Sequence, residues 1–310
     1  MSQSRPTVPV RGVFPIAPTP FTDDGDIDVE GQRRVLDCMI DQGVDGICIL
    51  ANYSEQFLLS DAEREMLLDL CMEHVAGRVP VIATCSHFST RIAVERVRRA
   101  EAAGAAMVMM MPPYHGALLR ADDLGVLEHF AAIDDALTIP IMVQDAPLSG
   151  VNLSVSLLAR MAEELGNVSF FKIETPQTAG KLRALLDAAS DAVKGPFDGE
   201  ESITLIADLD AGATGTMPSA LVPELIKKVV DAYLDGRRDE AVAQYAHILP
   251  TINYENRQCG LRATKAAMVE GGVIQSEAVR HPLTPLHPAT RAGLMELLRA
   301  LDPVVLRWGH

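Results

Sequence analysis

The 310-residue sequence predicts an α/β fold, a (β/α)8 TIM barrel with a C-terminal helical extension. Apolar segments typical of buried parallel strands alternate with segments of helical spacing, in about eight consecutive pairs. These pairs occupy about 235 residues, which suits a closed barrel. Beyond Asp235 only helical spacing remains. We therefore expect a barrel domain over 1–235 and a helical extension over 236–310.

The expected strands are short apolar segments bounded by Gly, Pro, Asn or Asp, the residues that commonly end strands. The first of them runs into a Pro-rich turn. In chain order the strands are 12–21 including that turn, 45–51, 80–86, 105–111, 139–145, 168–174, 192–197 and 212–217.

The expected helices show apolar residues that recur every three or four positions, as Val35, Leu36 and Met39 do. The second helix opens on Ser60-Asp61-Ala62-Glu63, which has the pattern of a capping box. The others are expected at 28–41, 89–103, 122–134, 154–165, 178–190, 201–210 and 222–234, followed in the extension by 239–249, 254–270 and 288–301.

An open, doubly wound parallel sheet is the alternative architecture. The best-known ligands of that fold are dinucleotides, which bind a Gly-x-Gly-x-x-Gly turn after the first strand. That motif does not follow the first strand here. The sequence thus favours the closed barrel and gives no sign of a dinucleotide cofactor.

The charge balance limits the classes of partner. The chain has 27 Lys and Arg against 42 Asp and Glu, a formal net charge of -15. Such a charge argues against binding nucleic acid or an anionic membrane. It does not exclude an anionic small substrate, because a local site can oppose the global charge.

The five cysteines are odd in number, lie mostly in apolar segments and form no Cys-x-x-Cys motif. Reduced thiols buried in a cytoplasmic protein are the expected state. The N-terminal segment is polar, without the apolar block of a signal peptide, and no apolar run is long enough to cross a bilayer. We expect a cytoplasmic protein.

The segment Val168-Ser169-Phe170-Phe171-Lys172-Ile173-Glu174 contains the most informative residue pair. Lys172 and Glu174 point to the same side of a strand, about 6.6 Å apart along it. A lysine that loses its hydration has a lowered pKa and can attack a carbonyl to form a Schiff base. A carboxylate on the same face can then move protons on the adduct. The alternative is a lysine at a strand end that merely forms an ion pair with Glu174.

In a (β/α)8 barrel the active site lies at the C-terminal ends of the strands and in the loops that follow them. Polar residues stand at these positions directly after apolar strands. They are Asn52, Tyr53, Ser54, Glu55, Ser86, His87, Tyr114, His115, Gln144, Asp145, Lys172, Glu174, 198–201 and Thr216. Lys194 comes earlier in its strand and is ranked well below Lys172.

Four segments carry a resemblance that covers nearly the whole chain. They are the opening 12–21, the Pro112-Pro113-Tyr114 turn, Lys172 in its strand, and Gly212-Ala213-Thr214-Gly215. The chain resembles the dihydrodipicolinate synthase/N-acetylneuraminate lyase family of Schiff-base (β/α)8 enzymes. The resemblance places Lys172 at the Schiff-base lysine and Tyr114 at a tyrosine that reaches a neighbouring subunit's site. It also implies a homotetramer.

Two departures from the family pattern bear on the substrate. The usual Gly-Thr-Thr-Gly-Glu loop reads Ala51-Asn52-Tyr53-Ser54-Glu55, and the usual Tyr-Asn-x-Pro motif reads Gln144-Asp145-Ala146-Pro147. An amide can replace a hydroxyl as donor to a carboxylate, but Gln144 cannot shuttle protons at neutral pH. The proton-transfer role then falls to Glu174, as in the 2-keto-3-deoxy sugar acid dehydratases of this family.

The resemblance implies a dehydratase for a small 2-keto acid, with L-2-keto-3-deoxyarabonate as the expected substrate and 2-oxoglutarate semialdehyde as the product. Lys172, Glu174, Gln144 and Tyr114 are the expected catalytic residues. Substrate contacts are expected from Asn52, Tyr53, Ser54 and Thr216, and from His87 and Glu201, for which ordinary loop roles are the alternative. No cofactor is expected, and no His, Asp or Glu set has the spacing of metal ligands.

Three rival functions stay open. The same enamine could undergo retro-aldol cleavage, which would make the chain an aldolase for 2-keto-3-deoxy sugar acids and release pyruvate. A 5-dehydro-4-deoxyglucarate dehydratase would act on a substrate with a second carboxylate. A non-catalytic keto-acid-binding protein on the same scaffold is the third, disfavoured by the intact Lys172/Glu174 pair.

Overall fold

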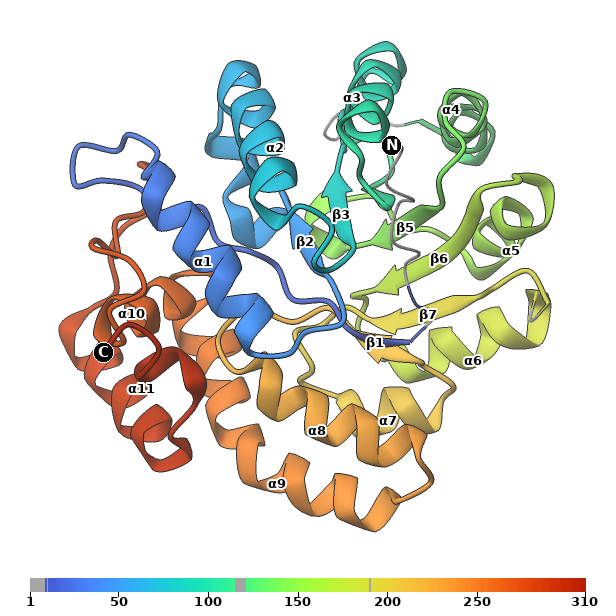
Figure 1. Ribbon diagram of the computed structural model, residues 1–310. Helices are drawn as coiled ribbons and strands as arrows, with labels where there is room; N and C mark the ends of the chain where they lie inside the picture. The colour runs from blue at the N-terminus through green and yellow to red at the C-terminus, as the bar shows by residue number, and fades with distance from the viewer. Residues whose placement is uncertain (1–8, 10, 115–120, 190) are drawn as a thin grey trace. The chain divides into compact units, whose positions relative to one another are not determined.

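The computed structural model describes residues 9, 11–114, 121–189 and 191–310 (Figure 1). Strands and helices alternate from β1 to α8, in the predicted order, and only helices follow. The alternating part comprises β1 (Gly12–Val13), α1 (Val29–Asp41), β2 (Ile47–Ile49), α2 (Asp61–Val75), β3 (Val81–Thr84), α3 (Thr90–Ala103), β4 (Met107–Met110), α4 (Asp123–Asp134), β5 (Ile141–Asp145), α5 (Val155–Glu164), β6 (Val168–Ile173), α6 (Thr178–Ala189), β7 (Gly195–Asp198), α7 (Leu205–Asp210), β8 (Gly215–Thr216) and α8 (Pro223–Leu234). The C-terminal helices are α9 (Arg238–Tyr254), α10 (Arg262–Glu270) and α11 (Pro288–Leu301).

The chain forms two compact units, each assembled from separate stretches. Among the described residues, unit 1 contains 80–200 and 204–217, and unit 2 contains 12–79, 201–203 and 218–310. Unit 1 thus holds β3 to β8, and unit 2 holds β1, β2 and the C-terminal helices.

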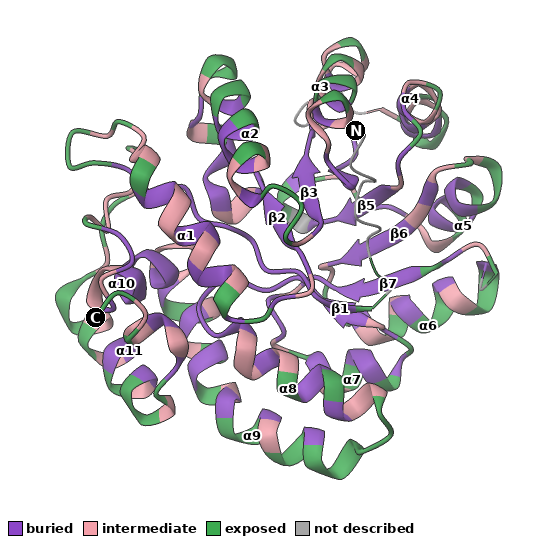
Figure 2. Cartoon of the chain, in the orientation of Figure 1, coloured by how far each residue is buried: buried purple, intermediate pink, exposed green. Residues whose placement is uncertain are grey.

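Unit 1 is a parallel sheet in which β3 to β8 are neighbours in chain order. Helices α3 to α6 cover the outer side of these strands (Figure 1). The strands are almost wholly buried (Figure 2), as their continuous Val, Ile, Met and Phe content requires of a sheet covered by helices. Their register pairs Lys172 of β6 with Gln144 of β5 and Phe197 of β7.

Unit 2 is held together by the first strands and by helices from both ends of the chain. Ile16 forms parallel bridges to Cys48 and to Ser219. The predicted capping box is present at α2, where the Ser60 hydroxyl accepts from the Glu63 amide at 3.2 Å and the Glu63 carboxylate accepts from the Ser60 amide at 2.8 Å. Helices α8 and α9 pack against each other.

Two predicted helix boundaries are wrong. We expected a helix to end at Leu249 before Pro250, but α9 continues through the proline to Tyr254. Ile248, Thr251 and Ile252 are buried on either side of it, so packing outweighs the lost hydrogen bond.

The other boundary concerns the helix expected from Glu201. It begins at Leu205, because Glu201 and Ser202 adopt left-handed φ angles of 52° and 66° that an α-helix excludes.

All five cysteines are free and buried, as predicted. No helix within the described residues is long and apolar enough to cross a membrane.

Candidate active site

Three of the predicted residues meet in unit 1. Lys172 on β6 is 3% exposed, and its Nζ lies 2.8 Å from Oε1 of Glu174. Gln144 donates from Nε2 to the same Oε1 at 2.7 Å. A buried amine, a carboxylate and an amide therefore form one cluster at the C-terminal ends of two adjacent strands.

The strand register explains this meeting. Gln144 and Lys172 are paired across β5 and β6, so their side chains point to the same side of the sheet. Glu174 comes two residues after Lys172, and its amide donates to the Asp145 carbonyl at 3.0 Å, which extends the pairing of the two strands by one residue. The predicted common face of Lys172 and Glu174 is confirmed.

Gly199 supports this cluster and was missed by the sequence analysis. A Cβ at position 199 would lie 2.7 Å from Cγ of Lys172 and 2.6 Å from Cγ of Glu174, closer than any real side chain approaches. Only glycine fits where the backbone passes so near both side chains. The available signal was a glycine directly after the strand that neighbours Lys172.

An ion pair lies directly behind Gln144. The Asp145 carboxylate is 1% exposed and pairs with Lys181 of α6, whose Nζ also donates to the Leu153 carbonyl at 2.5 Å. Burial raises the pKa of Asp145, the hydrogen bond from Lys181 opposes this rise, and the Glu174 carboxylate adds to it. Sequence reasoning singled out Asp145 as a strand-end residue but not its partner Lys181, which comes thirty-six positions later in a helix.

A surface cavity of about 580 Å³ opens beside Lys181. Its walls come from 150–155 and 175–177, with Gly180 and Lys181. Lys172 and Glu174 do not line it, so this cavity is separate from the amine-carboxylate cluster.

Thr216 of β8 is wholly buried, and its hydroxyl donates to Oδ2 of Asp198 at 2.6 Å. Asp198 is the last residue of β7, so the hydroxyl ties the ends of two neighbouring strands together. The substrate contact expected from Thr216 stays a prediction.

Tyr114 and His87 lie in an aromatic group at the end of β3 and β4. The Phe88 ring is stacked on His87 at 4.3 Å and meets Tyr114 edge-on at 6.4 Å between ring centroids. His87 also accepts from the Ser89 amide through Nδ1 at 2.9 Å. His115 lies outside the described residues.

Asn52, Tyr53 and Ser54 form one short 3-10 turn, η1 (Asn52–Ser54), in unit 2. Asn52 accepts from Nε2 of Gln56 at 2.6 Å. The buried Ser54 hydroxyl donates to the Ala17 carbonyl at 2.6 Å, and the Ser54 carbonyl accepts from the Thr19 hydroxyl at 2.8 Å. Ser54 holds the turn in place, while Asn52 and Tyr53 are only partly buried.

The turn is flanked by two non-glycine residues in the left-handed region, Leu50 and Glu55, each with φ 58°. Such conformations persist only when their surroundings fix them. Glu55 is fixed by Lys265, which pairs with its Oε1, and by the Arg280 amide, which donates to Oε2 at 3.1 Å.

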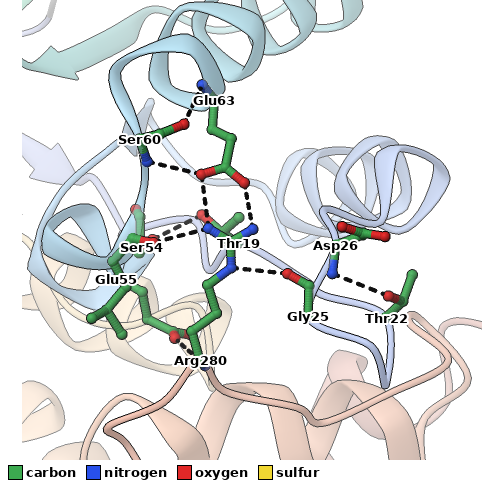
Figure 3. Close-up of polar contacts among 10 residues, drawn as sticks. Thr19, Thr22, Gly25, Asp26, Ser54, Glu55, Ser60, Glu63 and Arg280 are labelled. Atoms are coloured by element: carbon green, nitrogen blue, oxygen red, sulfur yellow. Dashed lines mark hydrogen bonds and ion pairs between the residues drawn. The ribbon is translucent and has the colours of Figure 1, made fainter.

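Arg280 extends this network to the start of α2 (Figure 3). Its guanidinium donates to the Gly25 and Leu58 carbonyls, each at 2.9 Å, and pairs with both oxygens of Glu63. The hydrogen bond from Arg280 lowers the pKa of Glu63 to about 2. The same carboxylate caps α2, so one charged network fixes both ends of the segment that carries η1.

Glu201 lies in a separate short stretch of unit 2 and is 8% exposed. The next two residues are anchored by Tyr245, whose hydroxyl donates to the Ser202 carbonyl at 3.1 Å and the Ile203 carbonyl at 2.6 Å. Within the part of the chain that the structure describes, no three His, Cys, Asp or Glu side chains gather closely enough to hold a metal ion.

Comparison with known proteins identifies the family. The family model described as dihydrodipicolinate synthetase matches residues 9–301. The chain is 55% identical over 300 residues to an L-2-keto-3-deoxyarabonate dehydratase of Azospirillum brasilense, covering 97% of each chain. It is 31% identical to a 4-hydroxy-tetrahydrodipicolinate synthase of Pelobacter propionicus, covering 91% of this chain and 95% of the relative.

Solved structures agree. A putative dihydrodipicolinate synthetase from Pseudomonas aeruginosa superimposes with a TM-score of 0.88 at 29% identity, covering 94% of this chain and 99% of the other. A prophage protein of the dihydrodipicolinic acid synthase family from Escherichia coli K12, in complex with pyruvate, gives a TM-score of 0.85 at 25% identity, covering 94% and 99%. The predicted (β/α)8 barrel with C-terminal helices is confirmed, and the chain belongs to the dihydrodipicolinate synthetase family.

Proposed function

We propose that the chain is a Schiff-base-forming dehydratase that converts L-2-keto-3-deoxyarabonate into 2-oxoglutarate semialdehyde and water, a reaction of L-arabinose catabolism. The observation that carries this proposal is the cluster of Lys172, Glu174 and Gln144, in which a buried amine lies 2.8 Å from a carboxylate. The 55% identity to a dehydratase of this substrate supports the substrate class.

The reaction begins on Lys172. Its Nζ adds to C2 of the keto acid, and loss of water gives a protonated imine that acts as an electron sink. Glu174 is near enough to accept a proton from the ammonium and so supply the neutral amine. Asn52 and Tyr53 are the proposed donors to the substrate carboxylate.

The elimination then needs one base and one acid. Glu174 removes a proton from C3 to give the enamine, which expels the C4 hydroxyl as water after Glu174 or an ordered water returns a proton to it. A proton shift from C5 to C3 produces an enol that becomes the aldehyde, and hydrolysis of the imine frees Lys172. Gln144 orients the Glu174 carboxylate and, in this proposal, the C4 hydroxyl. Tyr114 completes the site.

Product analysis tests the proposal. Purified enzyme is incubated with L-2-keto-3-deoxyarabonate and the products are separated by mass spectrometry, with K172A as the inactive variant. We expect the semialdehyde. Pyruvate instead would establish the aldolase, turnover restricted to 5-dehydro-4-deoxyglucarate would establish the other dehydratase, and no turnover of any keto acid would leave a binding protein.

A further inference from the structure

Two aspartates outside the amine-carboxylate cluster lie buried together in unit 1. Asp198 ends β7 and Asp208 lies in α7, and both are 0% exposed. Both oxygens of Asp198 already accept hydrogen bonds, Oδ1 from the Glu200 amide at 3.0 Å and Oδ2 from the Thr216 hydroxyl at 2.6 Å. The proposed chemistry uses neither aspartate.

Asp208 is differently supplied. Its Oδ2 accepts from the Thr204 hydroxyl at 2.5 Å, but its buried Oδ1 has no hydrogen-bond donor among the described residues. Its nearest polar partner is Asp198, close enough for the two carboxyl groups to hydrogen-bond to each other. A carboxyl oxygen can meet a carboxylate favourably only if a proton lies between them.

Electrostatics decides which member holds that proton. Burial raises the pKa of Asp208 to about 7, and the negative charges of Asp198 and Glu200 raise it further, against the Thr204 hydrogen bond. Helix α6, which packs on α7, buries Thr178, Leu182, Leu185 and Ala189 and adds no charged side chain to its buried set. Two ionised carboxylates in such surroundings would repel each other strongly. Asp198, with two donors, is therefore the ionised member, and Asp208 is the protonated one.

The pair acts on the site through Gly199. This residue directly follows Asp198, its amide donates to the Ile173 carbonyl at 2.9 Å, and its Cα packs on the side chains of Lys172 and Glu174. A displacement of the β7 end would move the backbone that confines both side chains.

We propose that Asp198 and Asp208 share one proton and thereby act as positioning residues, holding Gly199 against Lys172 and Glu174. The positioning role rests on the proposed function, whereas the shared proton does not.

The shared proton has a defined effect on stability. An aspartate has a pKa of about 3.9 in an unfolded chain, and Asp208 has one of about 7 when folded. Between these values the folded state holds a proton that the unfolded state has lost, so stability falls as pH rises. The fall approaches tenfold in the folding equilibrium constant per pH unit and levels off above about pH 7.

Asp208→Asn removes the titration and keeps a donor, because its amide can donate to Asp198 without a shared proton. Urea unfolding from pH 5 to 8 should show a weaker fall in stability than in the wild type. Asp210→Asn, the same change at an exposed position of α7, is the matched control and should behave as the wild type. The infrared band of a protonated buried carboxyl at pH 6 should disappear in D208N and persist in D210N.

Turnover tests the positioning role. In the wild type kcat should fall as Asp208 loses its proton above about pH 7, and in D208N the fall should shift to higher pH. Equal pH profiles of kcat in the two proteins would overturn the positioning role, and equal pH dependence of stability together with an unchanged infrared band would overturn the shared proton. Asp198→Asn, which puts the donor on the other member, should lose the same band and serves if D208N does not fold. The stability and infrared measurements use no substrate, so they stand even if the chain fails to dehydrate the sugar acid.

Discussion

Burial and pairing alone do not single out Lys172. Lys265 is also wholly buried and paired with a carboxylate, and burial lowers its pKa to about 8 despite Glu55. Lys265 belongs to the network that fixes Glu55, whereas Lys172 stands at a strand end beside Glu174 and Gln144. The exposed Lys194 precedes β7, in line with its low rank in the sequence analysis.

Glu174→Gln tests the proton-transfer role at the residue scale. Glutamine keeps the size of the side chain and its hydrogen bonding but cannot take the C3 proton. We expect kcat to fall by about 10²–10⁴-fold, the usual contribution of a general base. Borohydride trapping of pyruvate should persist, because imine formation needs the amine of Lys172.

Glu128→Gln, at an exposed position of α4, is the control and should turn over normally. Near-normal kcat in E174Q would move the proton transfer to another group.

At the scale of elements, the η1 turn depends on Arg280, more than two hundred residues away in sequence. The guanidinium serves Gly25, Leu58 and Glu63 at once and stacks on Phe21, with 4.4 Å from its carbon to the ring centroid. No local pattern predicts such a partner, because it depends on how the C-terminal segment returns to the first strands.

Arg280→Lys should expose this dependence. An ammonium cannot reproduce the planar, two-pronged pairing with Glu63 together with the two carbonyl contacts. We expect a loss of about 2 kcal/mol in the free energy of unfolding, measured with urea. If Asn52 and Tyr53 hold the substrate carboxylate, KM should rise more than kcat falls.

Arg299→Lys, at an exposed position of α11, is the matched control and should change neither quantity. Unchanged stability of R280K would show that the network does not fix the turn.

Local sequence signals predicted most elements but not every boundary. The Ser60–Glu63 capping box and the buried strands were correct because their causes are local. The passage of α9 through Pro250 depends on tertiary packing, and the late start of α7 depends on the left-handed pair Glu201 and Ser202. Neither cause is visible in a single sequence.

For the whole molecule, alternation of apolar strands with amphipathic helices was enough to predict the (β/α)8 class. The meeting of Lys172, Glu174 and Gln144 also followed, because strand periodicity and parallel register determine it. The supporting partners could not be predicted, since Lys181 and the Asp198–Asp208 pair reach their positions only through packing between elements.

Assembly is the prediction that belongs to this scale. The exposed ring of Phe88 beside Tyr114 has the character of an interface side chain. We expect native mass spectrometry to give four times the 33.4 kDa of one chain. A species of one chain's mass alone, at micromolar concentration and with full activity, would contradict the homotetramer and a role for Tyr114 in a neighbouring site.

The most direct test of the central claim is to find the atom that bonds to the substrate. The enzyme is mixed with L-2-keto-3-deoxyarabonate, reduced with borohydride, digested and sequenced by mass spectrometry. We expect the added mass on Lys172 in the wild type and in Lys194→Ala, and none in Lys172→Ala. An unmodified Lys172 in an enzyme that turns over, or a label on another lysine, would contradict the account.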